Sequence, residues 1–179
     1  MSQRHQGARR LALAGLMAAL CAICSQIQIP LPMIPLNLAL LSVFLSGALL
    51  GPKMGALSML TYALLGAAGI PVFAGFKAGP AALFGKTGGY ILGYILCALL
   101  CGALPRRLGF TMKGLCLSML CGLAACYTFG TVWFMLLTQL PLAASLSYCV
   151  LPFLPGDAIK IVLAAFLALR LRKPLSSLG

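Results

Sequence analysis

Residues 41–69 read LSVFLSGALLGPKMGALSMLTYALLGAAG, two apolar stretches separated by Gly51-Pro52-Lys53. Apolar segments approaching 20 residues can cross a bilayer as helices, because a helix satisfies its own backbone hydrogen bonds in lipid. Glycine followed by proline marks a turn. This stretch therefore predicts two short membrane-spanning helices, over about 36–51 and 54–70, joined by a tight turn.

The composition indicates that lipid surrounds the rest of the chain as well. Of the 179 residues, 62% are hydrophobic and 8% are charged, and Asp157 is the only acidic residue. A soluble domain carries about a quarter charged residues, so too few charges are available here to build a water-facing surface. The sequence therefore predicts an all-α integral membrane protein.

Four further apolar runs are suited to membrane-spanning helices. Together with the pair above, they predict a compact bundle of six transmembrane helices in one domain, residues 1–179. No internal repeat is evident and the chain is small for two rocking halves, which favours a transport function that depends on partner subunits. The expected spans are about 9–28, 36–51, 54–70, 88–106, 112–139 and 156–172.

The basic residues predict the orientation of the bundle. With the N terminus inside, ten of the thirteen lysines and arginines fall on the cytoplasmic side, the side that such residues favour. Both termini of this multi-pass protein are therefore predicted to be cytoplasmic. Because the charges flank apolar runs, nucleic-acid binding is excluded. The ten residues are Arg4, Arg9, Arg10, Lys53, Arg106, Arg107, Lys113, Arg170, Arg172 and Lys173.

The chain offers little chemistry for catalysis or metal binding. It has eight cysteines, but Cys21, Cys24, Cys97 and Cys101 lie in apolar runs that disfavour a thiolate, and the only histidine is His5. We interpret the cysteines as small apolar packing residues. One acidic residue and one histidine leave almost no acid–base machinery, so we expect no enzyme activity, no metal and no cofactor.

The connection over 71–87, PVFAGFKAGPAALFGKT, is a loop that is unusually apolar. Its glycines and prolines favour turns, while Phe73, Phe76 and Phe84 could fold over a binding site. Two interpretations stay open at this point. The loop is either a lid, as long loops in compact domains are usually functional, or a structural cap.

Asp157 and Lys160 stand at the start of the last predicted span, three residues apart and therefore on one helix face. Ionisable groups inside a membrane are costly and mark functional sites by default. The pair predicts a site for a polar or charged ligand. The alternative is a self-satisfied ion pair that only fixes helix packing, or a lysine that reaches out to the interface.

Several polar side chains near the external side are weaker candidates. Asn37 lies early in the second span, Gln26 and Gln28 end the first, and Tyr90 follows Gly88-Gly89 at the start of the fourth. Each of them is more often a packing or capping group.

Small residues repeat along the first span at Ala14, Ala18 and Ala22. This spacing makes a smooth strip that allows close helix contact in lipid. Whether the strip faces a partner or its own bundle is not decided by composition, because alanine is abundant throughout.

In order along the chain, the motifs resemble those of the BioY family, the biotin-specific substrate-binding components of energy-coupling-factor (ECF) transporters. Asn37 and Ala39 depart from the family pattern, which usually has threonine and glutamine there, and Lys86 stands where proline is common. The motifs that carry the resemblance are Gly47-Ala48-Leu49-Leu50-Gly51-Pro52, Leu65-Gly66-Ala67-Ala68-Gly69, Pro71-Val72-Phe73-Ala74-Gly75, Thr87-Gly88-Gly89-Tyr90 and Leu151-Pro152-Phe153-Leu154-Pro155-Gly156-Asp157-x-x-Lys160.

The resemblance implies a protein of a prokaryotic cell membrane that takes up biotin bound near the external face, with the loop as its cover. It also implies two ATPase subunits and a transmembrane coupling protein, the latter contacting Ala14, Ala18 and Ala22. A binding component for another vitamin and a small autonomous transporter are the alternatives. The expected substrate-binding residues are Asp157, Lys160, Asn37, Phe73, Tyr90, Thr87 and Gly88.

Overall fold

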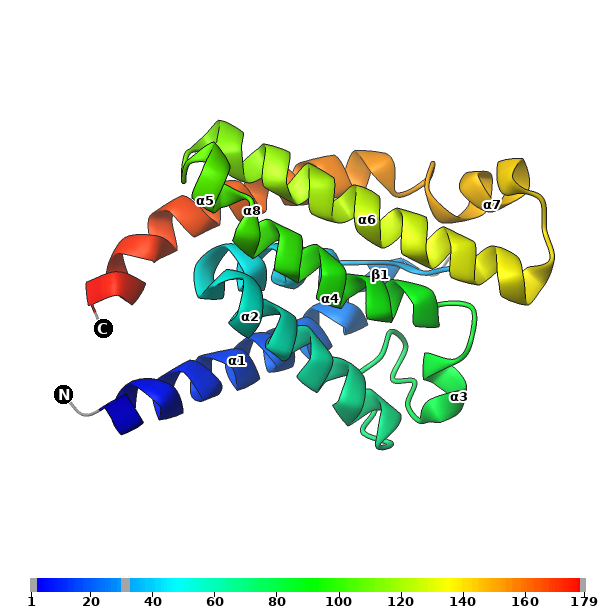
Figure 1. The fold of residues 1–179 in the computed structure, drawn as a ribbon. Helices are drawn as coiled ribbons and strands as arrows, with labels where there is room; N and C mark the ends of the chain where they lie inside the picture. The colour runs from blue at the N-terminus through cyan, green and yellow to red at the C-terminus, as the bar shows by residue number, and fades with distance from the viewer. Residues whose placement is uncertain (1–2, 30–32, 178–179) are drawn as a thin grey trace.

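The computed structural model describes residues 3–29 and 33–177, which fold into a bundle of helices with one short pair of antiparallel strands (Figure 1). In chain order the elements are α1 (Gln3–Gln26), β1 (Gln28–Ile29), β2 (Leu36–Asn37), α2 (Ala39–Ala67), α3 (Pro80–Leu83), α4 (Gly88–Ala103), α5 (Pro105–Leu108), α6 (Met112–Thr138), α7 (Leu142–Cys149) and α8 (Leu154–Ser177).

The tight turn predicted within 41–69 is present inside α2. The backbone leaves the helical conformation at Gly51, where φ is +79°, and Pro52 follows. A Cβ placed on Gly55 would lie 2.8 Å from the Cα of Gly47, eight residues earlier. In a straight helix such residues are about 12 Å apart along the axis. The two halves of α2 therefore fold back on each other, and Figure 1 shows the helix reversing direction.

Long apolar helices make up most of the bundle. Within the described ranges, four helices are long and apolar enough to cross a membrane: α1, α2, α4 extended through α5, and α6. A fifth candidate is the pair α7 and α8, which is bent by 51°. With α2 divided at Gly51, the six helical segments of the predicted bundle are α1, the two halves of α2, α4, α6 and α8.

Small residues allow α4 to approach both of its neighbours closely. A Cβ on Gly102 would lie 2.5 Å from the carbonyl carbon of Gly51 in α2. On the side of α6, a Cβ on Gly93 would lie 3.0 Å from the Cys126 sulfur. Cys97 and Cys101, also in α4, are fully buried. Packing of this kind holds helices together in lipid, where hydrophobic drive between them is weak.

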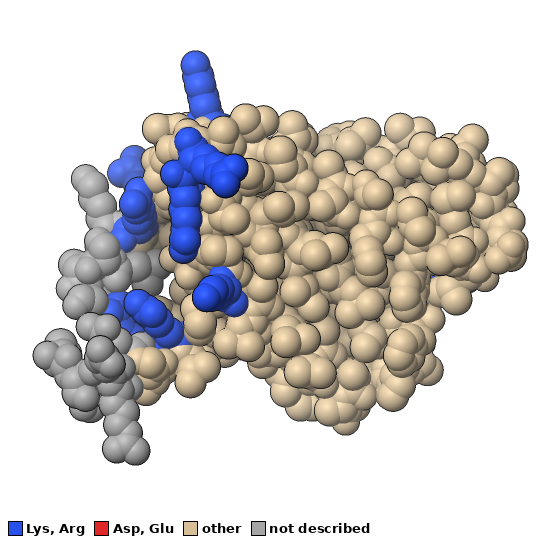
Figure 2. Space-filling view, in the orientation of Figure 1, with Lys and Arg blue, Asp and Glu red and all other residues tan. Residues whose placement is uncertain are grey.

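The surface agrees with the predicted orientation. Basic side chains gather at the end where α1 begins and α8 ends, and the rest of the visible face is uncharged (Figure 2). The side chains of Arg4 and Lys173 lie outside the described set. By the preference of Lys and Arg for cytoplasmic loops, this end faces the cytoplasm. The starts of α2, α4 and α8 and the end of α1 therefore face the external side.

The external connections contain more structure than the sequence predicted. The first forms a strand pair in which Gln28 faces Asn37. The second contains the short helix α3, and the third contains α7, which separates α6 from α8.

The alanine strip of α1 faces the protein's own bundle. Ala14 and Ala18 are 3% and 2% exposed, and Ala22 is half-buried. Ala14 and Ala18 therefore pack within the bundle, whereas the contact of Ala14, Ala18 and Ala22 with a coupling protein stays a prediction. The exposed face of α1 instead includes Leu16 and Ile23.

Candidate functional site

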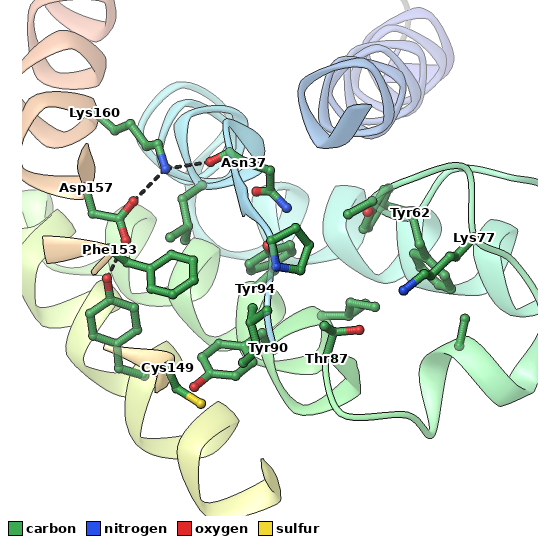
Figure 3. A pocket seen from close by; sticks show the side chains of 18 residues that line it. Asn37, Tyr62, Lys77, Thr87, Tyr90, Tyr94, Cys149, Phe153, Asp157 and Lys160 are labelled. Atoms are coloured by element: carbon green, nitrogen blue, oxygen red, sulfur yellow. Dashed lines mark hydrogen bonds and ion pairs between the residues drawn. The ribbon is translucent and has the colours of Figure 1, made fainter. Parts of the chain in front are cut away.

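A cavity lies at the external end of the bundle, where the helices α2, α4, α6 and α8 and the connection after α2 converge (Figure 3). The space between its walls is about 740 Å³ when the open solvent at its mouth is counted. Six aromatic side chains line it: Tyr62, Phe73, Tyr90, Tyr94, Tyr127 and Phe153.

A buried ion pair forms the polar end of this cavity. The Lys160 Nζ lies 2.6 Å from Oδ1 of Asp157, and the two side chains are 7% and 0% exposed. Lys160 also donates to the backbone carbonyl of Asn37 at 2.5 Å, and the Tyr127 hydroxyl donates to Oδ2 of Asp157. Loss of either charge would leave the other desolvated, which is strongly unfavourable.

The pair retains capacity to bind a ligand. An ammonium group has three N–H donors, and Lys160 uses two of them, on Asp157 and Asn37. Each carboxylate oxygen of Asp157 can accept more than one hydrogen bond. Both residues line the cavity. The structural ion pair considered from the sequence is therefore formed, but it is formed at the edge of a cavity.

Asn37 reaches the cavity from β2 and also starts the next helix. Its Oδ1 accepts a hydrogen bond from the backbone N–H of Ala39 at 3.1 Å, which satisfies a donor in the first turn of α2. Its Nδ2 makes no hydrogen bond to other residues of the described ranges. An amide donor is thus available beside Lys160, as Figure 3 shows.

The connection after α2 covers the cavity with a small hairpin, residues 72–77. Phe73 and Lys77 pair as an isolated antiparallel bridge, and Gly75 and Phe76 turn the chain with φ of +71° and +57°. Phe73 is 3% exposed and packs against Tyr62 in a T-shaped arrangement, with 5.5 Å between the ring centroids. Only this aromatic residue of the loop lines the cavity, because Phe76 and Phe84 are 70% and 63% exposed.

The structure brings six of the seven predicted substrate-binding residues around one cavity: Asp157, Lys160, Asn37, Phe73, Tyr90 and Thr87. Gly88 is the exception. A Cβ there would overlap the carbonyl oxygen of Leu83, so this glycine allows the tight turn from α3 into α4 and does not line the cavity.

Sequence reasoning missed several lining residues. Tyr94 lies one helical turn after Tyr90, and that spacing could have identified it. Tyr127 lies inside the apolar run of the predicted fifth span, where no local pattern marks it, and it bonds Asp157. Lys77 and Tyr62 gave no comparable signal in the sequence.

Several known proteins are similar to this chain over most of its length. The model of the BioY family matches residues 1–177. The chain is 41% identical to the Biotin transporter BioY of Thermotoga maritima over 165 residues, covering 92% of this chain and 96% of the relative. It is 37% identical to the Probable biotin transporter BioY of Pyrococcus horikoshii over 165 residues, covering 92% and 97%.

A solved structure, the S-component for biotin from an ECF-type ABC transporter, has the same fold. The TM-score is 0.88 at 30% identity, and the superposition covers 97% of this chain and 95% of that one. A family match over nearly the whole chain, close relatives and a shared fold lead to one conclusion: this multi-pass membrane protein belongs to the BioY family.

Proposed function

We propose that this chain binds biotin at the external side of the membrane and delivers it inward as the substrate-binding component of an ECF-type transporter. The proposal rests on one observation: the buried Asp157–Lys160 ion pair lines a cavity that also has aromatic side chains in its walls. The relatives and the solved structure that share this fold are named for biotin.

Biotin matches the cavity group by group. Its ureido ring offers two N–H donors and a carbonyl acceptor, its bicycle is apolar, and its side chain ends in a carboxylate. Asp157 can accept from the ureido N–H groups, and Lys160 and Asn37 can donate to the carbonyl. The aromatic walls suit the bicycle. Buried polar groups left unpaired would reject a ligand that lacked these partners.

The charges also favour one orientation of the ligand. Lys160 is already neutralised by Asp157, the only acidic residue of the chain. Lys77 lines the cavity from the hairpin and pairs with no acidic side chain among residues 3–29 and 33–177. We therefore place the ureido ring beside Asp157 and Tyr127 and the carboxylate beside Lys77.

Energy for uptake has to come from partners, because one acidic residue cannot supply the magnesium ligands and catalytic carboxylate of an ATPase. We propose that a transmembrane coupling protein, carrying two ATPase subunits, docks on the outward face of α1. Ala12, Gly15 and Ala19 are exposed there. A Cβ on Gly15 would meet no atom within 4 Å, so another helix could approach this face closely.

Retention of radiolabelled biotin by the purified protein tests the proposed substrate. We expect a complex that survives gel filtration and is displaced by unlabelled biotin, but not by riboflavin or thiamine at the same excess. If the protein instead retains riboflavin or thiamine and leaves biotin in solution, it is the binding component for a different vitamin.

A further inference from the structure

Gln26, the last residue of α1, holds the hairpin 72–77 by its backbone. Its Nε2 donates to the carbonyl oxygens of Val72 at 3.2 Å and Phe73 at 3.1 Å, and its Oε1 accepts from the N–H of Phe76 at 3.0 Å. The same Nε2 also contacts the carbonyl of Ala22 within α1, at 3.3 Å. One side chain thus binds the hairpin at three backbone positions.

Few other hydrogen bonds hold the hairpin. Its other backbone bonds run from the N–H of Phe73 to the carbonyl of Lys77 at 3.1 Å and from the N–H of Val72 to the carbonyl of Ile70 at 2.7 Å. Within the described part of the chain, no other side chain hydrogen-bonds to residues 72–77. Phe76 adopts a positive φ of +57°, which is uncommon for a bulky residue and persists only when surrounding contacts hold it. The bond from its N–H to Gln26 is such a contact.

The base of this attachment is itself fixed to the cavity wall. Ser25, the residue before Gln26, shares a hydrogen bond of 2.8 Å with the Tyr62 hydroxyl and donates to the carbonyl of Cys21 at 2.7 Å. Tyr62 in turn packs against Phe73. The end of α1 therefore has a defined position relative to both the wall and the cover of the cavity.

We propose that Gln26 is a positioning residue that latches the hairpin 72–77 over the cavity and so sets how long a bound ligand stays. The inference rests on the proposed function, because the ligand used to test it is biotin. Gln26 does not line the cavity, so it acts through Phe73, Ala74 and Lys77, which do. Opening of such a cover controls release more than encounter.

The test compares dissociation rates in a chase of radiolabelled biotin by unlabelled biotin. Replacement Gln26→Ala removes all three bonds and is expected to raise the dissociation rate about 10- to 100-fold, with an association rate within a few-fold of the original. Gln26→Glu keeps the acceptor for Phe76 but sets a carboxylate against two carbonyl oxygens, and should release biotin at least as fast as Gln26→Ala.

Thr128→Ala is the matched control. Thr128 is exposed, and its hydroxyl bonds only the carbonyl of Ala124 in its own helix. This variant should release biotin at the original rate. A latch that only supported folding would instead lower the fraction of active protein and leave the dissociation rate of that fraction unchanged, which would overturn the proposal.

A measurement without ligand separates the latch from the choice of substrate. In ligand-free protein, the amide of Phe76 should exchange its hydrogen about 10- to 100-fold faster in Gln26→Ala than in the original chain. Faster exchange in a protein that retains no biotin would support the latch and reject the substrate. Unchanged exchange together with unchanged release would reject the latch while leaving biotin binding intact.

Discussion

The ring of Phe73 occupies the space that a side chain on Gly66 would need: a Cβ on Gly66 would overlap three carbon atoms of that ring. Gly66 belongs to the last turns of α2, and Phe73 belongs to the hairpin that covers the cavity. The absence of a side chain on Gly66 therefore leaves a socket in the helix surface that the Phe73 ring fills. Steric packing in this socket holds the hairpin in place, in addition to the hydrogen bonds of Gln26.

Replacement Gly66→Ala should displace Phe73 and weaken ligand binding. The ring is 3% exposed and has little room to shift, so the added methyl group should force it out of its place in the cavity wall. Overpacking of this kind costs about 1–3 kcal/mol, or roughly 5- to 150-fold in biotin affinity. Titration calorimetry checks the value, with Gly7→Ala as the control, since a Cβ there meets nothing within 4 Å. Equal affinities for the two variants would contradict the socket.

Both members of the ion pair, Asp157 and Lys160, should be essential for biotin binding. Asp157→Asn and Lys160→Ala are each expected to weaken biotin binding by about 2–5 kcal/mol, because each leaves a buried charge without its partner. The double variant Asp157→Asn, Lys160→Met removes both charges and should regain thermal stability without regaining affinity. If the double variant binds normally, the pair serves packing alone.

Lys77 should recognise the carboxylate of the ligand. Lys77→Ala is expected to weaken biotin binding about tenfold, because a charge-assisted bond is lost at an exposed position. Biotin amide carries no carboxylate, so its affinity should differ little between Lys77→Ala and the original chain. Competition binding with both ligands measures this. An equal loss for biotin and its amide would place the carboxylate elsewhere.

Bound ligand should order the loop over 71–87. Trp133, the only tryptophan of the chain, donates from its indole N–H to the carbonyl of Gly85 at 3.1 Å, so α6 holds the far end of the loop. We expect slower hydrogen exchange of 71–79 with biotin and a change in tryptophan fluorescence on binding. Identical exchange with and without biotin would make the loop a static cap.

Assembly with a coupling protein should depend on the outward face of α1. Gly15→Leu and Ala19→Leu are expected to reduce assembly and uptake while leaving biotin affinity of the isolated subunit unchanged, because both residues are exposed. Ala18→Trp should impair binding and assembly together, since Ala18 is 2% exposed within the bundle. Co-purification measures assembly, with Ala124→Leu on exposed α6 surface as control. Normal assembly of both leucine variants would place the contact on another helix.

The sequence by itself determined the features that depend on local pattern. The length of the apolar runs predicted the helices, Gly51-Pro52 predicted the reversal inside α2, and the basic residues predicted the cytoplasmic end. The three-residue spacing of Asp157 and Lys160 was enough to place them on one helix face, and the ion pair that the structure shows was one of the interpretations left open.

Only the tertiary structure decided which face of each helix points inward. Ala14 and Ala18 turned out to be buried while Ala12 and Ala19 are exposed, and Phe73 lines the cavity while Phe76 and Phe84 do not. In a soluble protein the polar face of a helix reveals its orientation. In lipid the inner and outer faces are both apolar, so the sequence pattern carries little information on orientation.

The same limit applies to contacts between distant segments. Tyr127 meets Asp157 from 30 residues away, and Gln26 meets the hairpin from 46 to 50 residues away. These pairings exist because the ends of α1, α2, α6 and α8 converge at the external side, and the chain sequence of a single protein does not encode that convergence in any local pattern. The tertiary packing of the helices is what creates the cavity and its latch.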